Sequence, residues 1–180
     1  MIEIYTKKVT IPENLGLKVS GHEIELSLGD KKISKNIRVE GIELQQENHS
    51  ILISLKGKGK RVQSIGKTIE SHIQNMITGV TEGYTYELEI VFSHFPMNVS
   101  VKDKEIIINN FCGEKKPRIA LIRGKTSVEV KGKKVTVKGF DKEEVSQTAA
   151  NIENATKIRG RDIRVYQDGV YITSKAGKKL

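Results

Sequence analysis

The spacing of hydrophobic residues predicts two helices, one in each half of the chain. Apolar residues recur three or four positions apart over residues 62–76, which places them on one face of a helix, and Gly79 is a suitable end for it. A second helix is predicted from Asp141, whose side chain can cap the free amides while Glu144 reaches back. Its apolar stripe covers residues 145–152. Each half therefore has one amphipathic helix with an apolar face to bury.

Short segments that alternate in polarity or are rich in β-branched residues predict strands around these helices. Gly132-Lys133 predicts a hairpin loop, and Asp168-Gly169 predicts a type I′ turn between residues 164–167 and 170–173. One helix covering one face of an antiparallel sheet would give each half a core. The predicted strands are residues 23–28, 37–42, 51–55, 84–92, 105–109, 119–122, 127–131, 134–138 and 164–173.

The order of these segments repeats along the chain. Residues 19–26 align with residues 101–108 at an offset of 82, a second pair of predicted strands aligns 84 positions apart, and a helix follows in each half. We therefore expect an α+β fold of two tandem, structurally similar units, each a small antiparallel sheet packed against one helix. The N-terminal repeat is expected over residues 1–83 and the C-terminal repeat over residues 84–180.

The composition, 37% hydrophobic and 29% charged over 180 residues, is enough to bury a core. No segment approaches the roughly 20 apolar residues of a membrane helix, and the first residues lack the apolar centre of a signal peptide, so we expect the protein inside the cell. The single cysteine, Cys112, cannot form an internal disulfide and has no partner at metal-ligand spacing. We interpret it as a small buried or half-buried thiol.

The formal net charge of +9 is unevenly distributed. Residues 1–93 contain 12 Lys and Arg and 12 Asp and Glu, whereas residues 94–180 contain 19 and 10. This asymmetry favours a polyanionic partner for the second half, since neutralised phosphates release counterions. Nucleic acid is the first candidate. An anionic membrane is weaker, because no long basic helix has an aromatic or Leu-rich opposite face.

Three groups of basic residues in the second half are candidate RNA contacts. One surrounds the hairpin predicted at Gly132-Lys133, one follows the second helix, and the last is expected as a mobile tail that becomes ordered against RNA. A glycine-spaced basic segment at residues 56–61 could also follow a phosphate backbone, but a solvated loop explains it equally well. The candidates are Lys131, Lys133, Lys134 and Lys138; Lys157, Arg159, Arg161 and Arg164; and Lys175, Lys178 and Lys179.

Features that would indicate an enzyme are weak. Residues 66–68 and 124–126 both read Gly-Lys-Thr, like the end of a nucleotide-binding loop, but the glycine required five positions earlier is replaced by Arg61 and Ile119. The four histidines are scattered, without the spacing of a metal or protease motif. We therefore predict no catalytic residue, cofactor or metal, and an enzyme with a site hidden from the sequence is the more distant alternative.

A long segment resembles a known family. Residues 154–172 read NATKIRGRDIRVYQDGVYI and resemble the C-terminal signature of the L-six family of large-subunit ribosomal proteins, in its archaeal and eukaryotic form. The departures are Asn154, where the family usually has Gln, and Tyr166, where it usually has Phe. Four other segments are also similar to this branch of the family, so the resemblance covers most of the chain. They are residues 71–77, 79–81, 94–99 and 110–115.

The resemblance implies a structural constituent of the large ribosomal subunit, cytoplasmic and ribosome-associated, with no membrane partner. It implies binding to large-subunit (23S-type) rRNA, mainly through the C-terminal half, near the stalk base and the sarcin-ricin loop where translation factors dock. Neighbouring ribosomal proteins would be further partners of a protein that is a monomer within the subunit. The matching motif assigns RNA contact to Arg161, Arg164 and Lys175, with Lys157 and Arg159 as neighbours.

Tyr166 and Tyr171 allow two interpretations. Aromatic residues in alternating strands usually pack in the core, which we expect here, and stacking on a base is the alternative. Asp168 and Gly169 are assigned to the turn. A non-ribosomal RNA-binding module remains an alternative function, although 5% aromatic residues and no Trp weigh against it. We expect the second half alone to retain RNA affinity and residues 1–80 alone to lack it.

Overall fold

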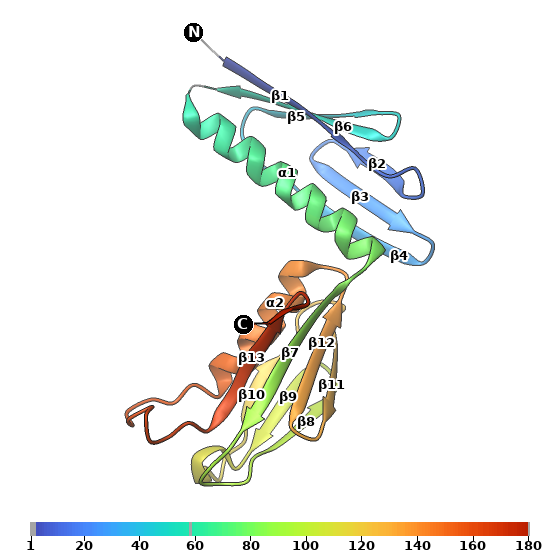
Figure 1. Cartoon of the computed structure of the whole chain (residues 1–180). Helices are drawn as coiled ribbons and strands as arrows, with labels where there is room; N and C mark the ends of the chain where they lie inside the picture. Colours follow the sequence, from blue (N-terminus) through green and yellow to red (C-terminus); the bar gives the residue numbers. More distant parts are fainter. Residues whose placement is uncertain (1–2, 58, 180) are drawn as a thin grey trace. The chain divides into compact units, whose positions relative to one another are not determined.

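The computed structural model describes residues 3–57 and 59–179 of the chain. The chain divides into two compact units, Met1–Glu82 and Gly83–Leu180, and each unit buries its own hydrophobic core. Each unit combines antiparallel strands with one α-helix (Figure 1). The predicted α+β class, with two tandem sheet-plus-helix units, is confirmed.

Unit 1 contains two three-stranded antiparallel sheets, with orders β1-β6-β5 and β2-β3-β4, where one sheet was expected. Helix α1 packs against strands of both sheets, so their apolar faces and the helix share one core. The elements are β1 (Glu3–Thr10), β2 (Gly16–Ser20), β3 (Glu23–Leu28), β4 (Lys31–Asn36), β5 (Ile42–Glu47), β6 (Ser50–Gly57) and α1 (Lys60–Thr81).

Helix α1 forms along the predicted stripe, with Ile69 and Ile73 among its buried residues. It does not end at Gly79, because Gly79 and Val80 are themselves buried and the helix continues to Thr81. Gly66 lies inside the helix, where a Cβ atom would overlap the ring of Tyr5. Close packing therefore accounts for the first Gly-Lys-Thr sequence.

Unit 2 also contains two antiparallel sheets, with orders β10-β9-β8 and β11-β12-β7-β13-β14. Helix α2 contacts both sheets, through β10 on one side and β7, β12 and β13 on the other. The elements are β7 (Tyr84–Val91), β8 (Asn98–Lys102), β9 (Glu105–Asn109), the short 3₁₀ turn η1 (Phe111–Gly113), β10 (Arg118–Leu121), β11 (Ser127–Lys131), β12 (Lys134–Gly139), α2 (Lys142–Ala155), β13 (Gly169–Lys175) and β14 (Lys178–Lys179).

The two units repeat one topology, six strands followed by a helix. Sheet β1-β6-β5 of unit 1 corresponds to β7-β12-β11 of unit 2, and β2-β3-β4 corresponds to β8-β9-β10. Unit 2 then adds β13 and β14 on the other edge of β7, so β7 lies between β12 and β13 (Figure 1). The added strands and the segment before them have no counterpart in the six-strand-and-helix part of unit 1.

The start of α2 shows the predicted cap. The Asp141 carboxylate accepts a hydrogen bond from the backbone N–H of Glu143 at 2.8 Å. Glu144 was predicted to reach back to the start of the helix. Its Oε2 atom instead accepts a hydrogen bond from the backbone N–H of Lys125 at 3.0 Å. A carboxylate thus occupies the turn of the second Gly-Lys-Thr sequence, where a nucleotide phosphate would have to bind.

The hairpin at Gly132-Lys133 is confirmed. The predicted strand 37–42 is wrong, and the predicted strand 164–173 is wrong in its first half. Residues 37–41 form a loop, although Ile37 and Ile42 are buried, because Gly41 adopts a positive φ of 77° and turns the chain into β5. Residues 164–167 belong to a loop in which the Asp162 carbonyl accepts hydrogen bonds from the two residues Val165 and Tyr166. The predicted strand 164–173 therefore begins only at Gly169.

Candidate nucleic-acid interface

The eleven predicted RNA contacts are all exposed and all lie in unit 2, where they form three groups in the structure. Four lysines belong to the β11–β12 hairpin, four basic residues lie between α2 and β13, and three lysines belong to β13 and β14. We call residues 157–167 the basic loop. The surroundings of the three groups differ, and so does their capacity to attract a polyanion.

The lysines of the β11–β12 hairpin share their surface with glutamates. Strand register places Lys131, Lys134 and Lys138 on the sheet face opposite the buried valines of β12. Lys134 pairs with Glu89 of β7, and Lys131 forms an ion pair with Glu129 at 2.7 Å. The hydrogen bond that Lys131 donates in this ion pair lowers the pKa of Glu129.

On that face the three lysines meet three acidic residues, Glu87, Glu89 and Glu129. The fourth lysine of the group, Lys133, lies in the hairpin loop with its ammonium group 4.9 Å from the centre of the Phe92 ring. The face is therefore close to electrically balanced. Its attraction for a polyanion is weaker than the count of lysines suggests.

The basic loop has a strong excess of positive charge. Lys157, Arg159, Arg161 and Arg164 are exposed, and Asp162 is the only acidic residue among residues 157–167. The Asp162 carboxylate accepts a hydrogen bond from the backbone N–H of Arg164 at 2.9 Å, which shapes the loop. The net charge of the loop is thus +3 over eleven residues.

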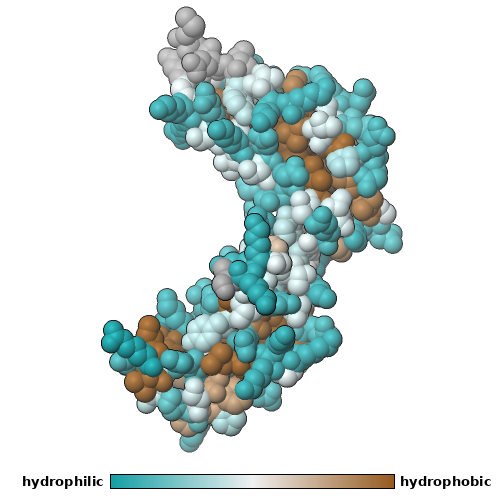
Figure 2. All heavy atoms as spheres, viewed as in Figure 1, coloured by the Kyte–Doolittle hydropathy of each residue, from teal (hydrophilic) through white to brown (hydrophobic). Residues whose placement is uncertain are grey.

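Hydrophobic side chains are also exposed on this loop, with Ile163 70% and Val165 58% exposed. The loop extends from the end of α2 away from the sheet (Figure 1), and Figure 2 shows hydrophobic residues among hydrophilic ones at its position. Apolar groups exposed next to cations are typical of a contact surface rather than of a solvated charge run.

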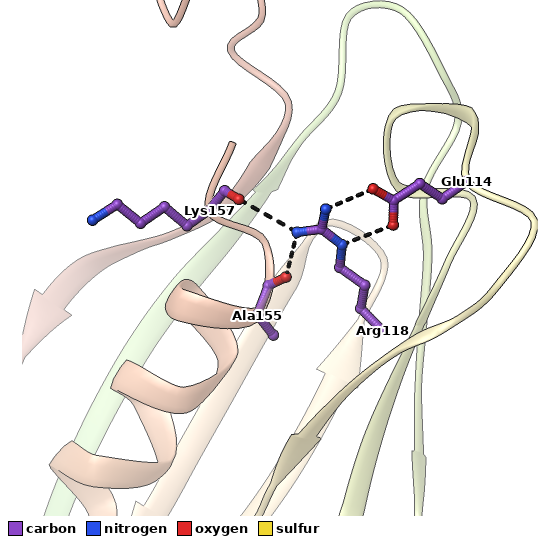
Figure 3. A network of polar contacts seen from close by, with 4 residues as sticks. All are labelled: Glu114, Arg118, Ala155 and Lys157. Atoms are coloured by element: carbon purple, nitrogen blue, oxygen red, sulfur yellow. Dashed lines mark hydrogen bonds and ion pairs between the residues drawn. The ribbon is translucent and has the colours of Figure 1, made fainter. Parts of the chain in front are cut away.

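Arg118 of β10 holds the start of the basic loop (Figure 3). Its Nη1 atom donates to the backbone carbonyls of Ala155 at 2.9 Å and of Lys157 at 3.3 Å. The other side of the guanidinium makes two hydrogen bonds to Glu114, at 2.6 and 2.8 Å, and the group lies 4.2 Å from the centre of the Phe111 ring. The carbonyl of Ala155, in the last turn of α2, thereby gains a partner, and the carbonyl of Lys157 is held at the start of the loop.

The pairing is also visible in the acid–base properties of the two residues. The hydrogen bond between them raises the pKa of Arg118 and lowers that of Glu114. Each shift favours the charged form of the residue, and therefore the ion pair between them.

Asp168 holds the end of the loop, and its assignment to a type I′ turn is wrong. Its side chain is buried, with 1% exposed, and Oδ1 accepts a hydrogen bond from the backbone N–H of Ser93 at 2.7 Å. Nδ1 of His94 lies 3.5 Å from the same oxygen. Burial by itself would raise the pKa of Asp168, but the hydrogen bonds from Ser93, His94 and Phe95 outweigh it and lower the pKa.

The two tyrosines are not core residues, contrary to our expectation. Tyr166 is half-buried and stacks on His94, with ring centroids 5.0 Å apart, and the Arg161 guanidinium lies 4.8 Å from the centre of its ring. Tyr171 is 42% exposed, and its hydroxyl donates to the carbonyl of Gln167 at 3.1 Å. Both rings therefore support the basic loop.

The remaining candidates have simpler environments. Lys175 and Lys178 pair across the short β13–β14 hairpin, so the expected mobile tail is ordered up to Lys179. In the segment 56–61, Lys56 forms an ion pair with Glu43 at 2.6 Å and α1 begins at Lys60, while residue 58 lies outside the described residues. Of the described residues of that segment, 56 and 57 end β6 and 60 and 61 begin α1.

Other kinds of site find no support in the described part of the chain. No three His, Cys, Asp or Glu side chains among residues 3–57 and 59–179 gather closely enough to hold a metal ion. None of the helices described is long and apolar enough to span a membrane. Cys112 is half-buried, and burial raises the pKa of its thiol, as expected for an unreactive cysteine.

The fold and the anchored loop define a basic, two-unit α+β protein with a surface suited to a polyanion. The family model for Ribosomal protein L6 matches residues 95–169. The large ribosomal subunit protein uL6 of Methanococcus vannielii is 45% identical over 174 residues, which cover 97% of this chain and 96% of that protein. The proteins of the same name from Methanothrix thermoacetophila and Thermoplasma acidophilum are 40% and 44% identical, covering 97% and 94% of this chain and 99% and 95% of theirs.

The chain belongs to the ribosomal protein L6 family, which confirms the resemblance drawn from residues 154–172. It is a ribosomal protein of the large subunit, associated with ribosomes in the cytoplasm, and a structural protein rather than an enzyme. The supporting residues Arg118 and His94 were not found by sequence reasoning. Arg118 reaches loop carbonyls 37 and 39 positions away and His94 lies 74 positions from Asp168, so no local pattern marks these contacts.

Proposed function

We propose that this protein binds large-subunit, 23S-type rRNA mainly through residues 83–180, near the stalk base and the sarcin-ricin loop, where translation factors dock. The basic loop carries the proposal. It presents four exposed cations on a backbone that is fixed at its start by Arg118 and at its end by Asp168. The relatives that match most of this chain are named as proteins of the large ribosomal subunit.

The anchoring matters because ordering a flexible loop on binding lowers affinity. A loop that is already fixed gains the full benefit of releasing counterions from the phosphates it neutralises. Arginine suits this task, since its planar guanidinium can grip a phosphate with two parallel hydrogen bonds. Three of the four cations of the loop are arginines, Arg159, Arg161 and Arg164.

The other predicted contacts belong to the proposal with smaller roles. Lys175, Lys178 and Lys179 add positive charge on a short ordered hairpin. The lysines of the β11–β12 hairpin, Lys131, Lys133, Lys134 and Lys138, contribute less per residue because glutamates lie beside them. The position near the translation-factor site, and contacts with neighbouring ribosomal proteins as a monomer, are supported by the family signature in residues 154–172.

Cosedimentation tests this function directly. Tagged protein expressed in its own cells is followed through separation of ribosomal subunits, before and after a high-salt wash. Because extended rRNA contacts outlast weak electrostatic ones, we expect stoichiometric retention on the large subunit after the wash. Absence from that fraction would overturn the proposal and favour the alternative, a free RNA-binding module.

A further inference from the structure

A pocket of about 290 Å³ opens beside the basic loop. Its lining comes from three parts of unit 2: the end of α2 with its C-cap (Glu153, Asn154, Thr156), the basic loop (Lys157, Ile158, Ile163) and strand β13 (Tyr171). The volume lies at the lower end of the range for small-molecule sites. The space therefore suits one flat group and is too small for a larger ligand.

The walls of the pocket are apolar and open to water. Ile163 is 70% exposed and Tyr171 is 42% exposed, while Ile158 is partly buried and packs against the core of unit 2. The Tyr171 ring has a fixed position, since its hydroxyl donates to the carbonyl of Gln167 at 3.1 Å. An aromatic face held in place beside aliphatic side chains is the arrangement on which unstacked bases bind in RNA-binding proteins.

The rim of the pocket offers hydrogen-bond partners for the edge of such a group. The Glu153 carboxylate is held there by the backbone N–H of Ile172, which donates to its Oε1 atom at 3.2 Å. A carboxylate accepts hydrogen bonds from the amino and imino groups of bases, and the amide of Asn154 can both donate and accept. The pocket thus combines an apolar interior with a polar edge, as a nucleobase does.

The positive charge around the pocket favours an occupant that carries phosphate groups. Lys157 is part of the lining, and Arg159, Arg161 and Arg164 belong to the loop that forms one wall. A nucleobase in the pocket brings phosphates to these cations, whereas an aliphatic side chain of a protein would bring none. Building on the proposed function, we infer that this pocket takes one unstacked base of the bound rRNA.

The test uses the full-length protein and large-subunit rRNA purified from its own cells. Affinity is measured by filter binding at several salt concentrations for Tyr171→Ala, Tyr171→Phe and Ile163→Ala. Ile119→Ala is the matched control, because Ile119 is 53% exposed in the same unit and does not line the pocket. Circular dichroism checks the fold of each variant, and Tyr171→Phe keeps the ring if Tyr171→Ala is poorly folded.

We expect Tyr171→Ala to lose about tenfold or more in affinity, as for other lost base–aromatic stacks, with an unchanged dependence on salt because no phosphate contact is removed. Ile163→Ala should lose several-fold, Tyr171→Phe should lose much less than Tyr171→Ala because it keeps the ring but not its hydroxyl contact, and Ile119→Ala should bind like the wild type. Ultraviolet irradiation of the wild-type complex, followed by nuclease digestion and mass spectrometry, should find a nucleotide attached to the peptide that contains Tyr171.

Three results would overturn the inference. One is equal affinity of Tyr171→Ala and Ile119→Ala, and another is a nucleotide adduct found only on peptides outside the pocket. The third is an equal loss for Tyr171→Phe and Tyr171→Ala, because the hydroxyl contact to Gln167 would then explain the effect through loop position. In each case the wild type still binds rRNA, whereas failure of the wild type to bind would overturn the proposed function itself.

Discussion

Arg118 and Asp168 fix the ends of the basic loop through contacts that are distant in sequence. Arg118 reaches carbonyls 37 and 39 positions ahead, and Asp168 accepts from an amide 75 positions behind it. Both residues use strong, charge-assisted hydrogen bonds in partly or fully buried places. The shape of the loop is therefore set by single residues of the scaffold rather than by the propensities of its own sequence.

The state of Asp168 leads to a prediction for stability. Its pKa is lowered in the folded protein, so the folded state binds fewer protons than the unfolded state as the pH falls through about 4, the ordinary value for Asp. The resulting stabilisation is present above that pH and is lost as the pH falls through the folded pKa. We expect Asp168→Asn to lower the free energy of unfolding at pH 7 by about 1–3 kcal/mol and to weaken its dependence on acid pH.

Urea unfolding between pH 3 and pH 7, followed by circular dichroism, measures both effects. Asp162→Asn is the matched control, since Asp162 is exposed in the loop that Asp168 ends. Equal unfolding free energies for Asp168→Asn and the wild type at pH 7 would show that the buried carboxylate is not an anchor.

Both helices and one hairpin were predicted well from local patterns in the sequence, whereas strands β1, β2, β4, β5 and β8 were not predicted. The two helices follow from the 3.6-residue spacing of their apolar positions, and the β11–β12 hairpin follows from alternation around Gly132. Errors arose where a distant partner decides the structure. Asp168-Gly169 has the sequence of a tight turn, but the Ser93 amide captures the Asp168 side chain and holds the chain as a loop.

The basic residues of the candidate site were predicted from the sequence, but their arrangement in space was not. The four cations of the basic loop were identified from the sequence, whereas their separation from the balanced face of the β11–β12 hairpin depends on strand register. Register brings Glu89 beside Lys134 from a strand 45 positions earlier. The pocket under the loop depends in the same way on Tyr171 remaining at the surface.

The difference between the basic loop and the β11–β12 hairpin in their contribution to RNA affinity can be measured. Replacing Arg159 and Arg161 by alanine should lower the slope of log affinity against log salt by roughly 0.7–0.9 for each lost phosphate contact. Replacing Lys134 and Lys138 on the balanced face should change the slope less. Filter binding of the full-length variants to large-subunit rRNA tests the ranking, and equal changes in slope for the two double variants would contradict it.

At the scale of the whole molecule, the two units differ in charge while sharing a topology. Residues 1–82 contain 12 Lys and Arg and 10 Asp and Glu, and residues 83–180 contain 19 and 12. Each unit has a separate hydrophobic core with one helix. Folding and RNA affinity should therefore be separable properties of the two halves.

This separation predicts the behaviour of fragments. We expect residues 83–180 alone to fold and to retain most of the affinity for large-subunit rRNA, while residues 1–82 fold but bind weakly, because the excess charge and the anchored loop lie in the second fragment. Circular dichroism checks folding, and filter binding at equal salt compares affinity. Equal binding by the two folded fragments would contradict the prediction.

The strand order also bears on how such a protein could arise and change. The repeated part ends with α2, and the basic loop, β13 and β14 come after it. A duplicated gene would thus have supplied the scaffold twice, and the segment added behind the second copy would have supplied the proposed contact surface. The added segment also contains most of residues 154–172, which carry the resemblance to the L6 family, so the part of unit 2 that the repeat does not supply is the part that marks the family.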